Sequence, residues 1–148
     1  GGSFGGHAAA QAFLKSADYD LAGVITECPV LDKTASFPPE VYGMLPPFSV
    51  DGVRTRLGLE PGSSLDDFAD LFRVIQLEGQ GLYDTDPIDT PLLAISTTDD
   101  PVADLEDLDK LLSFATQSQR IILQEEGHCP DSISVDLVTT DWIVNNLR

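Results

Sequence analysis

The chain has 148 residues, of which 42% are hydrophobic, so it is long enough to bury the core of one domain. Eight Lys and Arg residues stand against 25 Asp and Glu residues, and the net charge of −17 argues strongly against binding to nucleic acid or to an anionic membrane surface. No apolar run reaches the roughly 20 residues that a membrane-spanning helix needs, and we expect a cytoplasmic protein.

The acidic residues are dispersed along the chain rather than gathered in one tail, which is typical of a solvated surface. Such a surface suits a protein that works in concentrated salt, because the Debye length is only about 3 Å at ~1 M salt and the repulsion between carboxylates is then screened. We therefore predict a halophilic protein, with an acidic mesophilic protein as the alternative.

The chain has two cysteines, Cys28 and Cys129, which lie far apart in the sequence. Neither belongs to a C-x-x-C pair or to a group of Cys and His residues at the spacing of metal ligands. We therefore expect neither a disulfide framework nor a zinc site, and we interpret Cys129 as a small buried apolar residue.

Residues 1–6 read Gly-Gly-Ser-Phe-Gly-Gly and run directly into an alanine-rich stretch. In a nucleophile elbow the chain turns sharply from a strand into a helix, and the serine at the tip has a strained backbone. Side chains two positions before and two positions after Ser3 would collide with the neighbouring strand and helix, so glycine is expected at Gly1 and Gly5. The pattern predicts a helix from Gly5 to about Lys15 with the Ser3 hydroxyl at its N-terminus; a glycine-rich linker is the alternative.

Residues 21–26 form a short, continuously apolar run with β-branched side chains, which is typical of a buried parallel strand. Pairs of prolines then interrupt the chain, and helices are predicted at 51–57 and 65–77. We interpret residues 32–86 as a helical, cap-like insertion between strands of the sheet. A disordered linker is the alternative, but the aromatic and leucine content of this stretch is too high for one.

The second of these predicted helices has a recognisable beginning. Ser64 and Asp67 stand in the S-x-x-D pattern of a capping box, in which each side chain accepts a hydrogen bond from the backbone of the other. Apolar side chains then recur at helical spacing along one face of the helix.

Further apolar runs at 90–96 and 120–123 predict two more buried strands, and helical periodicity separates them and follows the last one over 134–147. Strands that alternate with helices predict an α/β fold, in which helices cover both faces of a parallel sheet. Functional side chains of such folds gather at the carboxyl ends of the strands.

Three chemically suited residues follow predicted strand ends in the order Ser3, Asp100, His128. Serine is a weak nucleophile, so a histidine must accept its proton, and a carboxylate must hold the imidazole in the correct tautomer. His128 lies in a Gly-His-x-Pro sequence after the last strand. Asp100, in Asp-Pro-Val, is the predicted acid; Asp99 is the near alternative and Glu27 a distant one.

Two further residues beside the elbow have assigned roles. The backbone N–H of Phe4, directly after the predicted nucleophile, is the expected oxyanion-hole donor. His7 lies one helical turn beyond Ser3, and we expect it to pack against the helix rather than to act as the base.

At these residues the chain resembles the α/β-hydrolase superfamily over nearly its whole length. It resembles the FrsA-like esterase group more narrowly at residues 39–42, 56–59, 91–101 and 140–143. The resemblance implies a serine hydrolase of carboxylic esters that forms an acyl-enzyme intermediate and needs no cofactor and no metal. Relatives in the group cleave carbon–carbon bonds of β-dicarbonyl compounds with the same triad. The implied partner is therefore a small-molecule ester or β-dicarbonyl substrate, with neither nucleic acid nor membrane, and a homodimer stays open.

The chain also departs from this superfamily. A complete member has about five strands before the elbow helix, whereas this sequence begins at the elbow itself. The loop that supplies the second oxyanion-hole donor is then missing, and the loss of one donor costs on the order of 3–4 kcal/mol. We therefore expect residues 1–148 to be a partial α/β-hydrolase domain, a fragment of a longer enzyme that is inactive alone. A non-catalytic remnant is the alternative.

Overall fold

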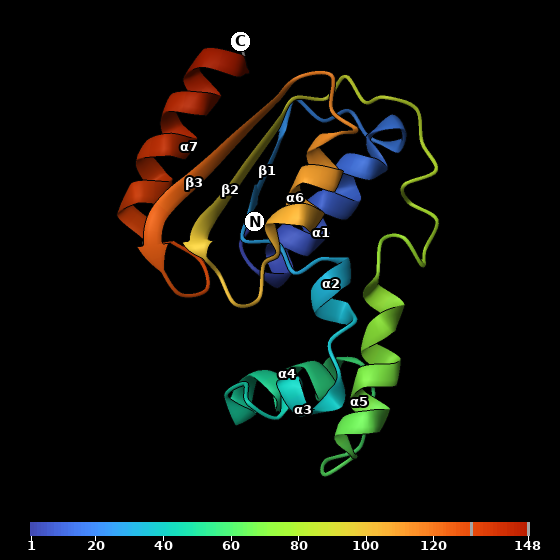
Figure 1. Cartoon of the computed structure of the whole chain (residues 1–148). Coiled ribbons are helices and arrows are strands. Elements are labelled where there is room, and N and C mark those ends of the chain that lie inside the picture. Colours follow the sequence, from blue (N-terminus) through green and yellow to red (C-terminus); the bar gives the residue numbers. More distant parts are fainter. Residues whose placement is uncertain (131, 148) are drawn as a thin grey trace.

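The computed structural model describes residues 1–130 and 132–147. Helices and strands alternate at both ends of the chain, and a run of short helices separates the first two strands (Figure 1). The elements are α1 (Phe4–Leu14), η1 (Ser16–Asp18, a 3₁₀ helix), β1 (Val24–Glu27), α2 (Asp32–Ala35), α3 (Pro39–Tyr42), α4 (Pro47–Arg56), α5 (Leu65–Phe72), η2 (Arg73–Ile75, 3₁₀), β2 (Leu92–Asp99), α6 (Leu105–Leu112), β3 (Ser118–Glu126) and α7 (Ser132–Asn146).

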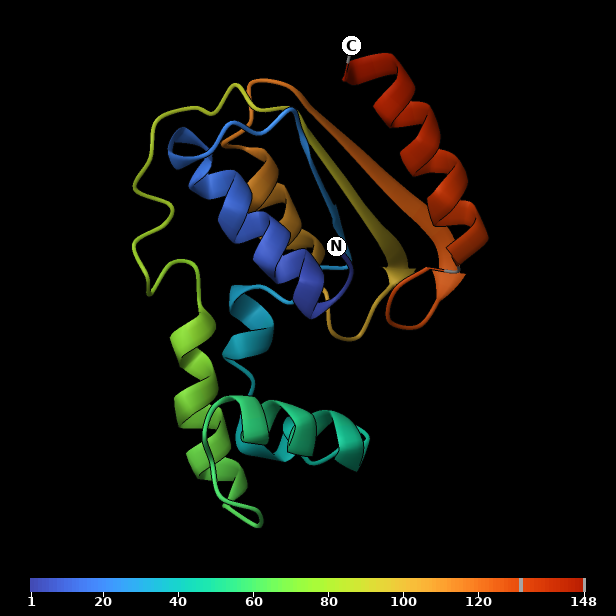
Figure 2. The same ribbon diagram turned by 180° about the vertical axis from the view of Figure 1, so that it is seen from behind.

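The three strands form one parallel sheet in the order β1-β2-β3, with Val24 beside Leu92 and Leu92 beside Ser118. Helices α1 and α6 cover one face of the sheet and α7 covers the other (Figures 1 and 2). The predicted α/β class is confirmed, because parallel strands need crossover helices and those helices bury both faces.

The sequence of the central strand, β2, is apolar without alternation, and the position of this strand in the sheet explains why. Leu92 packs into the cluster that α1 forms with the sheet, whereas Leu93 and Ile95 pack against Trp142 of α7. All three strand residues are fully buried. A strand that is covered on both faces gains from an apolar side chain at every position, which is the pattern seen at 92–95.

Residues 32–75, called the helical segment below, lie beyond the carboxyl ends of the strands (Figure 1). The expected capping box of α5 is present with both of its hydrogen bonds, between Ser64 and Asp67. Helix α4 begins earlier than predicted, at Pro47, because proline suits the first turn of a helix. From 76 to β2 the chain runs in turns, and the extent of the predicted insertion, 32–86, stays a prediction.

The helical segment has a small aromatic core of its own. Tyr42, Phe68 and Phe72 are buried and contact one another, with ring centroids 5.0–5.5 Å apart. Each ring buries a large apolar area, so these short helices are held by packing rather than by their length.

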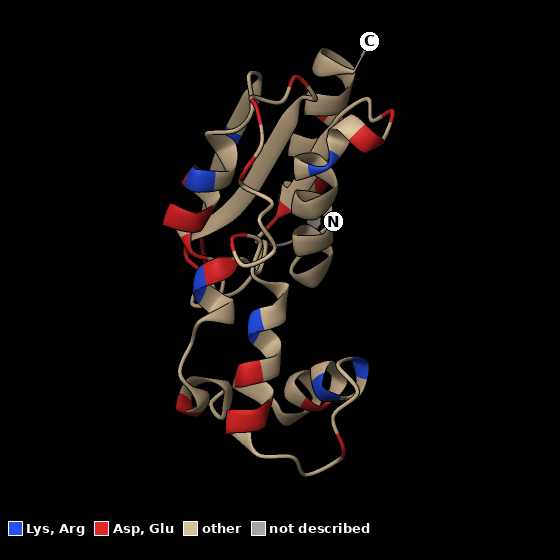
Figure 3. Cartoon of the chain, turned by 90° about the vertical axis from the view of Figure 1, so that its right-hand side faces the viewer, with Lys and Arg blue, Asp and Glu red and all other residues tan. Residues whose placement is uncertain are grey.

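Acidic positions lie on both the sheet and the helical segment, and they outnumber the basic positions throughout (Figure 3). Among the described residues, no helix combines the length and the apolar character that crossing a membrane requires.

Candidate active site

Ser3 stands at a sharp turn directly before α1. Its backbone has φ 52° and ψ −118°, a left-handed conformation that side chains rarely adopt, and its N–H donates to the Glu27 carbonyl at the end of β1 over 2.9 Å. Strain of this kind persists only where the surroundings fix it. The turn therefore places the hydroxyl at the carboxyl edge of the sheet and at the start of a helix, as an elbow requires.

The glycines around Ser3 have unequal roles. A side chain at Gly1 would collide with the Gly5 carbonyl, as expected, but a side chain at Gly5 would meet nothing within 4 Å. The expectation for Gly5 is wrong, because Gly6 is the residue that faces the strand. A Cβ atom there would lie 2.6 Å from the Glu27 carbonyl oxygen.

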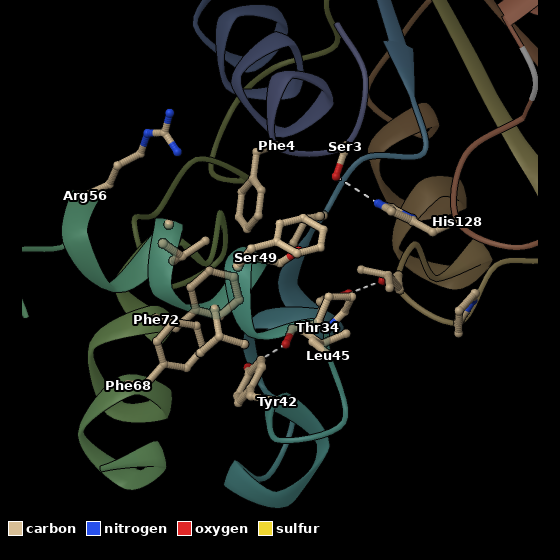
Figure 4. A pocket seen from close by; sticks show the side chains of 18 residues that line it. Ser3, Phe4, Thr34, Tyr42, Leu45, Ser49, Arg56, Phe68, Phe72 and His128 are labelled. Carbon is tan, nitrogen blue, oxygen red and sulfur yellow. Dashed lines mark hydrogen bonds between the residues drawn. The ribbon is translucent and has the colours of Figure 1, made fainter. Parts of the chain in front are cut away.

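The three predicted catalytic residues form one chain of hydrogen bonds. Ser3 Oγ lies 2.8 Å from His128 Nε2, although the two residues are 125 positions apart. His128 Nδ1 lies 2.9 Å from Asp100 Oδ1 and 3.0 Å from Oδ2. The contact between Ser3 and His128 is drawn in Figure 4. The spacing is that of a serine, its base and the group that orients the base.

The surroundings of Asp100 settle the tautomer of the histidine. The carboxylate accepts hydrogen bonds from the backbone N–H groups of Val102 and Ala103, each over 2.8 Å, and of Cys129 over 3.3 Å. Burial alone would raise the pKa of Asp100, but the hydrogen bonds from His128, Ala103 and Val102 hold the pKa below its usual value. An ionised carboxylate only accepts hydrogen bonds. His128 Nδ1 is therefore the protonated nitrogen, and Nε2 can accept the serine proton.

The two alternative acids are placed differently. Asp99 ends β2 with an exposed side chain, and Glu27 ends β1, where burial raises its pKa. Among the described residues, His128 forms no hydrogen bond with either of them. The pairing of β2 with β3 shifts in register between Thr97 and Asp99. Such an irregularity changes the direction in which the following side chains point.

Thr97 is a residue that the sequence analysis did not single out. Its side chain is fully buried on β2, and its hydroxyl donates to the Gly127 carbonyl over 2.8 Å. The bond ties the loop that carries His128 to the central strand. A threonine near a strand end has no distinctive pattern, so only the fold reveals this role.

Cys28 and Cys129 form a disulfide across 101 residues, with their Cα atoms 5.2 Å apart. The expectation of no disulfide framework is wrong, and Cys129 is a bonded, half-buried residue rather than a free apolar one. Like Ser3, both cysteines have positive φ, 37° and 67°. In the described part of the chain these three are the only residues other than glycine with that conformation, and all of them adjoin the candidate site.

His7 and Phe4 occupy the first turn of α1. His7 is buried, its Nδ1–H donates to the Val30 carbonyl over 2.7 Å, and burial lowers its pKa. It thus packs beside the helix, as expected. The Phe4 N–H is the first of the helix and has no acceptor among the described residues, so it is free for an oxyanion.

A cavity of about 570 Å³ begins at Ser3 and His128 and extends into the helical segment. In Figure 4, Phe68, Phe72 and Tyr42 line the part of the cavity away from Ser3 and His128, and Arg56 also lies far from Ser3. The apolar lining residues are Phe4, Val30, Tyr42, Leu45, Pro46, Phe48, Val50, Val53, Phe68, Phe72, Pro101 and Val102. The volume is that of a small-molecule site.

Comparisons with known proteins give similarity in structure but not in sequence. No protein-family model matches the chain, and no curated protein matches its sequence. Similar solved structures are a monoacylglycerol lipase from Paleococcus ferrophilus (17% identity, TM-score 0.58), a thermophilic esterase from Thermogutta terrifontis (16%, 0.58) and a hydrolase from Oleispira antarctica (18%, 0.54).

Each of these matches covers 99% of this chain but only 67%, 65% and 64% of the respective neighbour. The chain thus spans about two thirds of the length of the structures it resembles. Its parallel sheet, the helices on both faces and the elbow before α1 agree with that likeness. The chain has part of the α/β-hydrolase fold.

Proposed function

We propose that the chain carries the triad and substrate pocket of a serine hydrolase that cleaves carboxylic esters, related to the FrsA-like esterases and part of a longer enzyme. The observation that carries this proposal is the hydrogen-bonded series Ser3, His128, Asp100 at the mouth of an apolar cavity. The lipase and esterase among the structural neighbours agree with it at the level of fold.

The geometry supports acyl transfer in two steps. Ser3 Oγ attacks the ester carbonyl while His128 Nε2 takes the hydroxyl proton, and the same proton then goes to the leaving alcohol. The acyl-enzyme that remains is hydrolysed by a water molecule, whose proton passes to Nε2 in turn. Asp100 stabilises the imidazolium in both steps because it is buried, ionised and hydrogen-bonded to Nδ1.

The negative charge of the tetrahedral intermediate has one assigned donor in this chain. The Phe4 N–H, at the positive end of α1, is placed directly after the nucleophile. A second donor would come from the loop after the third strand of a complete hydrolase. We therefore expect acylation by reactive probes to be observable, whereas turnover of ordinary esters needs the remaining part of the enzyme.

The pocket favours a neutral, apolar ester over a β-dicarbonyl compound. A second carbonyl would need a polar partner, but the hydroxyl groups of Thr34 and Tyr42 already donate to backbone carbonyls, those of Val102 and Thr34 respectively. Apart from Ser3, this leaves Ser49 as the lining hydroxyl that could donate to a substrate. The remaining charged group, Arg56, lies away from Ser3 (Figure 4). Carbon–carbon hydrolysis is the alternative that the same triad could support.

A fluorophosphonate probe tests the proposal, because it phosphonylates a serine only where a base removes the hydroxyl proton as fluoride leaves. We expect labelling of Ser3 in the unmodified chain, with loss in Ser3→Ala and in His128→Ala. Ser113→Ala, which changes an exposed serine at the C-terminal end of α6, is the matched control and should label normally. Labelling that survives Ser3→Ala would refute the assignment, and a folded chain without any labelling would favour a non-catalytic remnant.

A further inference from the structure

The disulfide lies against the catalytic histidine rather than elsewhere in the fold. Cys28 follows β1, Cys129 follows His128, and one ligand atom from each of Cys28, His128 and Cys129 lies within 4.8 Å of the others. We propose that reduction of the disulfide creates a site for a thiophilic divalent cation of the zinc type, which takes His128 as its third ligand and switches the triad off.

The distances suit such an ion. Tetrahedral zinc binds thiolate sulfur at about 2.3 Å and imidazole nitrogen at about 2.0–2.1 Å, so two of its ligand atoms stand roughly 3.3–3.8 Å apart. The imidazole nitrogen of His128 lies within 4.8 Å of both sulfurs, so it needs to approach them by about 1 Å at most. The two sulfurs, bonded in the oxidised chain, need only to separate, because their Cα atoms are 5.2 Å apart and can stay in place.

Reduction supplies the ligands that the oxidised chain lacks. A dithiol reductant transfers two electrons to the S–S bond, each cysteine sulfur gains a proton, and the reductant itself becomes a disulfide. Binding of the cation then releases both thiol protons to solvent, because thiolate is the ligand. Two thiolates, a neutral imidazole and a dication have no net charge, so the half-buried site gains no uncompensated charge.

Binding through either nitrogen of His128 would disable the triad. Coordination through Nε2 would remove the lone pair that accepts the Ser3 proton, and Asp100 on Nδ1 would then act as the outer carboxylate common around zinc-bound histidines. Coordination through Nδ1 would displace Asp100. In the oxidised chain neither occurs, since both sulfurs are committed to each other. The disulfide thus protects the histidine from metal.

The metal site rests on the geometry of three side chains, whereas its inhibitory effect also rests on the proposed hydrolase function. The experiment separates the two by using cobalt(II) as a spectroscopic substitute for zinc. Thiolate-to-cobalt charge transfer absorbs in the near ultraviolet, and the many carboxylates of this chain cannot produce that absorption. The oxidised chain, with the same carboxylates, is the matched control.

We expect the charge-transfer absorption only after reduction with a phosphine, with one cobalt bound per chain. Cys28→Ser should abolish the two-thiolate spectrum. His128→Ala should weaken binding at least about tenfold, since even the loss of an outer partner costs 10–100-fold. Zinc should slow fluorophosphonate labelling of Ser3 in the reduced chain alone, and a chelator should restore it.

Several results would overturn the proposal. These are a reduced, folded chain without charge-transfer absorption, unchanged affinity in His128→Ala, and loss of helical circular dichroism on reduction that zinc does not restore. If cobalt binds but labelling of Ser3 is unaffected, the switch is refuted. If Ser3 labels in no state, the proposed hydrolase function fails while the cobalt spectrum still decides whether the metal site exists.

Discussion

The sheet and the helical segment make opposite contributions to the same cavity. The turn before α1 and the loops after β2 and β3 supply the residues of the proposed triad, whereas residues 32–75 supply most of the apolar wall of the cavity. The two regions also differ in net charge. The helical segment has seven acidic and four basic residues, a net charge of −3, which leaves −14 for the other residues. In the proposed hydrolase, catalysis and substrate fit thus depend on different parts of the chain, so they should respond to different substitutions.

The largest effect is expected from Asp100→Asn, which keeps the shape of the side chain but lets the imidazole adopt the wrong tautomer. Comparable changes lower rates by about 10⁴. We expect labelling of Ser3 by a fluorophosphonate to slow by a similar factor while the circular dichroism spectrum stays the same. Asp99→Asn is the matched control, because Asp99 is exposed and should have little effect. If Asp99→Asn slowed the labelling of Ser3 strongly instead, the acid would be Asp99 rather than Asp100.

A pair of phenylalanine substitutions separates the two regions directly. Phe13 is fully buried beneath the sheet and Phe68 is buried in the helical segment, so Phe→Ala at either should lower the free energy of unfolding by about 3–5 kcal/mol. Only Phe68→Ala enlarges the cavity. It should therefore raise the labelling rate of long-chain relative to short-chain alkyl fluorophosphonates.

Phe13→Ala should leave that ratio unchanged. Equal changes in chain-length preference for both variants would show that the helical segment does not select the substrate.

Salt should stabilise the molecule mainly through the charge of the residues outside the helical segment. Between about 0.1 M and ~1 M potassium chloride the Debye length falls from about 10 Å to about 3 Å, and repulsion among the carboxylates is screened. We expect the thermal midpoint to rise by about 5 °C, which corresponds to ~1–2 kcal/mol for a chain of this size. A midpoint that is constant or falls with salt, followed by circular dichroism, would contradict the halophilic interpretation.

The smallest effect is expected from Thr97→Val, which keeps the shape of the side chain but removes its hydrogen bond to Gly127. The loss of such a bond costs about 1–2 kcal/mol when the carbonyl is left unpaired. Labelling of Ser3 should slow severalfold because the histidine loop is less constrained. Thr98→Val removes a bond to Leu123 on β3 instead, and it should change stability but not labelling.

Local pattern predicted the elements well. The three strands and the flanking helices lie where the spacing of apolar residues and the local composition predicted them. An apolar run of β-branched residues and a capping box are local signals, so both can be read from the sequence. Boundaries shifted by a few residues, as at α4, where Pro47 starts the helix. The order of Ser3, Asp100 and His128 could be predicted because Ser3 lies in an elbow motif before a helix and the other two follow strands, although the catalytic roles of these residues stay a prediction.

Contacts between distant segments were not readable. The disulfide joins cysteines 101 residues apart, and nothing in their local sequence marks them as partners. Whether Gly5 or Gly6 must lack a side chain depends on which of the two faces β1. The motif does not specify how the first turn of α1 is oriented toward that strand. The apolar wall of the cavity was not predicted, since its residues come from four helices and three loops that only the fold brings together.

The disulfide has a further consequence for a chain that has been cut. Cys28 and Cys129 enclose the helical segment, the central strand and the whole of β3, while Ser3 and His128 lie near the two ends of the sequence. A single proteolytic cleavage in the exposed turns between 57 and 64 would leave two pieces that remain covalently joined beside the site. A nicked molecule should therefore migrate as one species on a non-reducing gel and keep its triad assembled, and it should separate into two fragments once the disulfide is reduced.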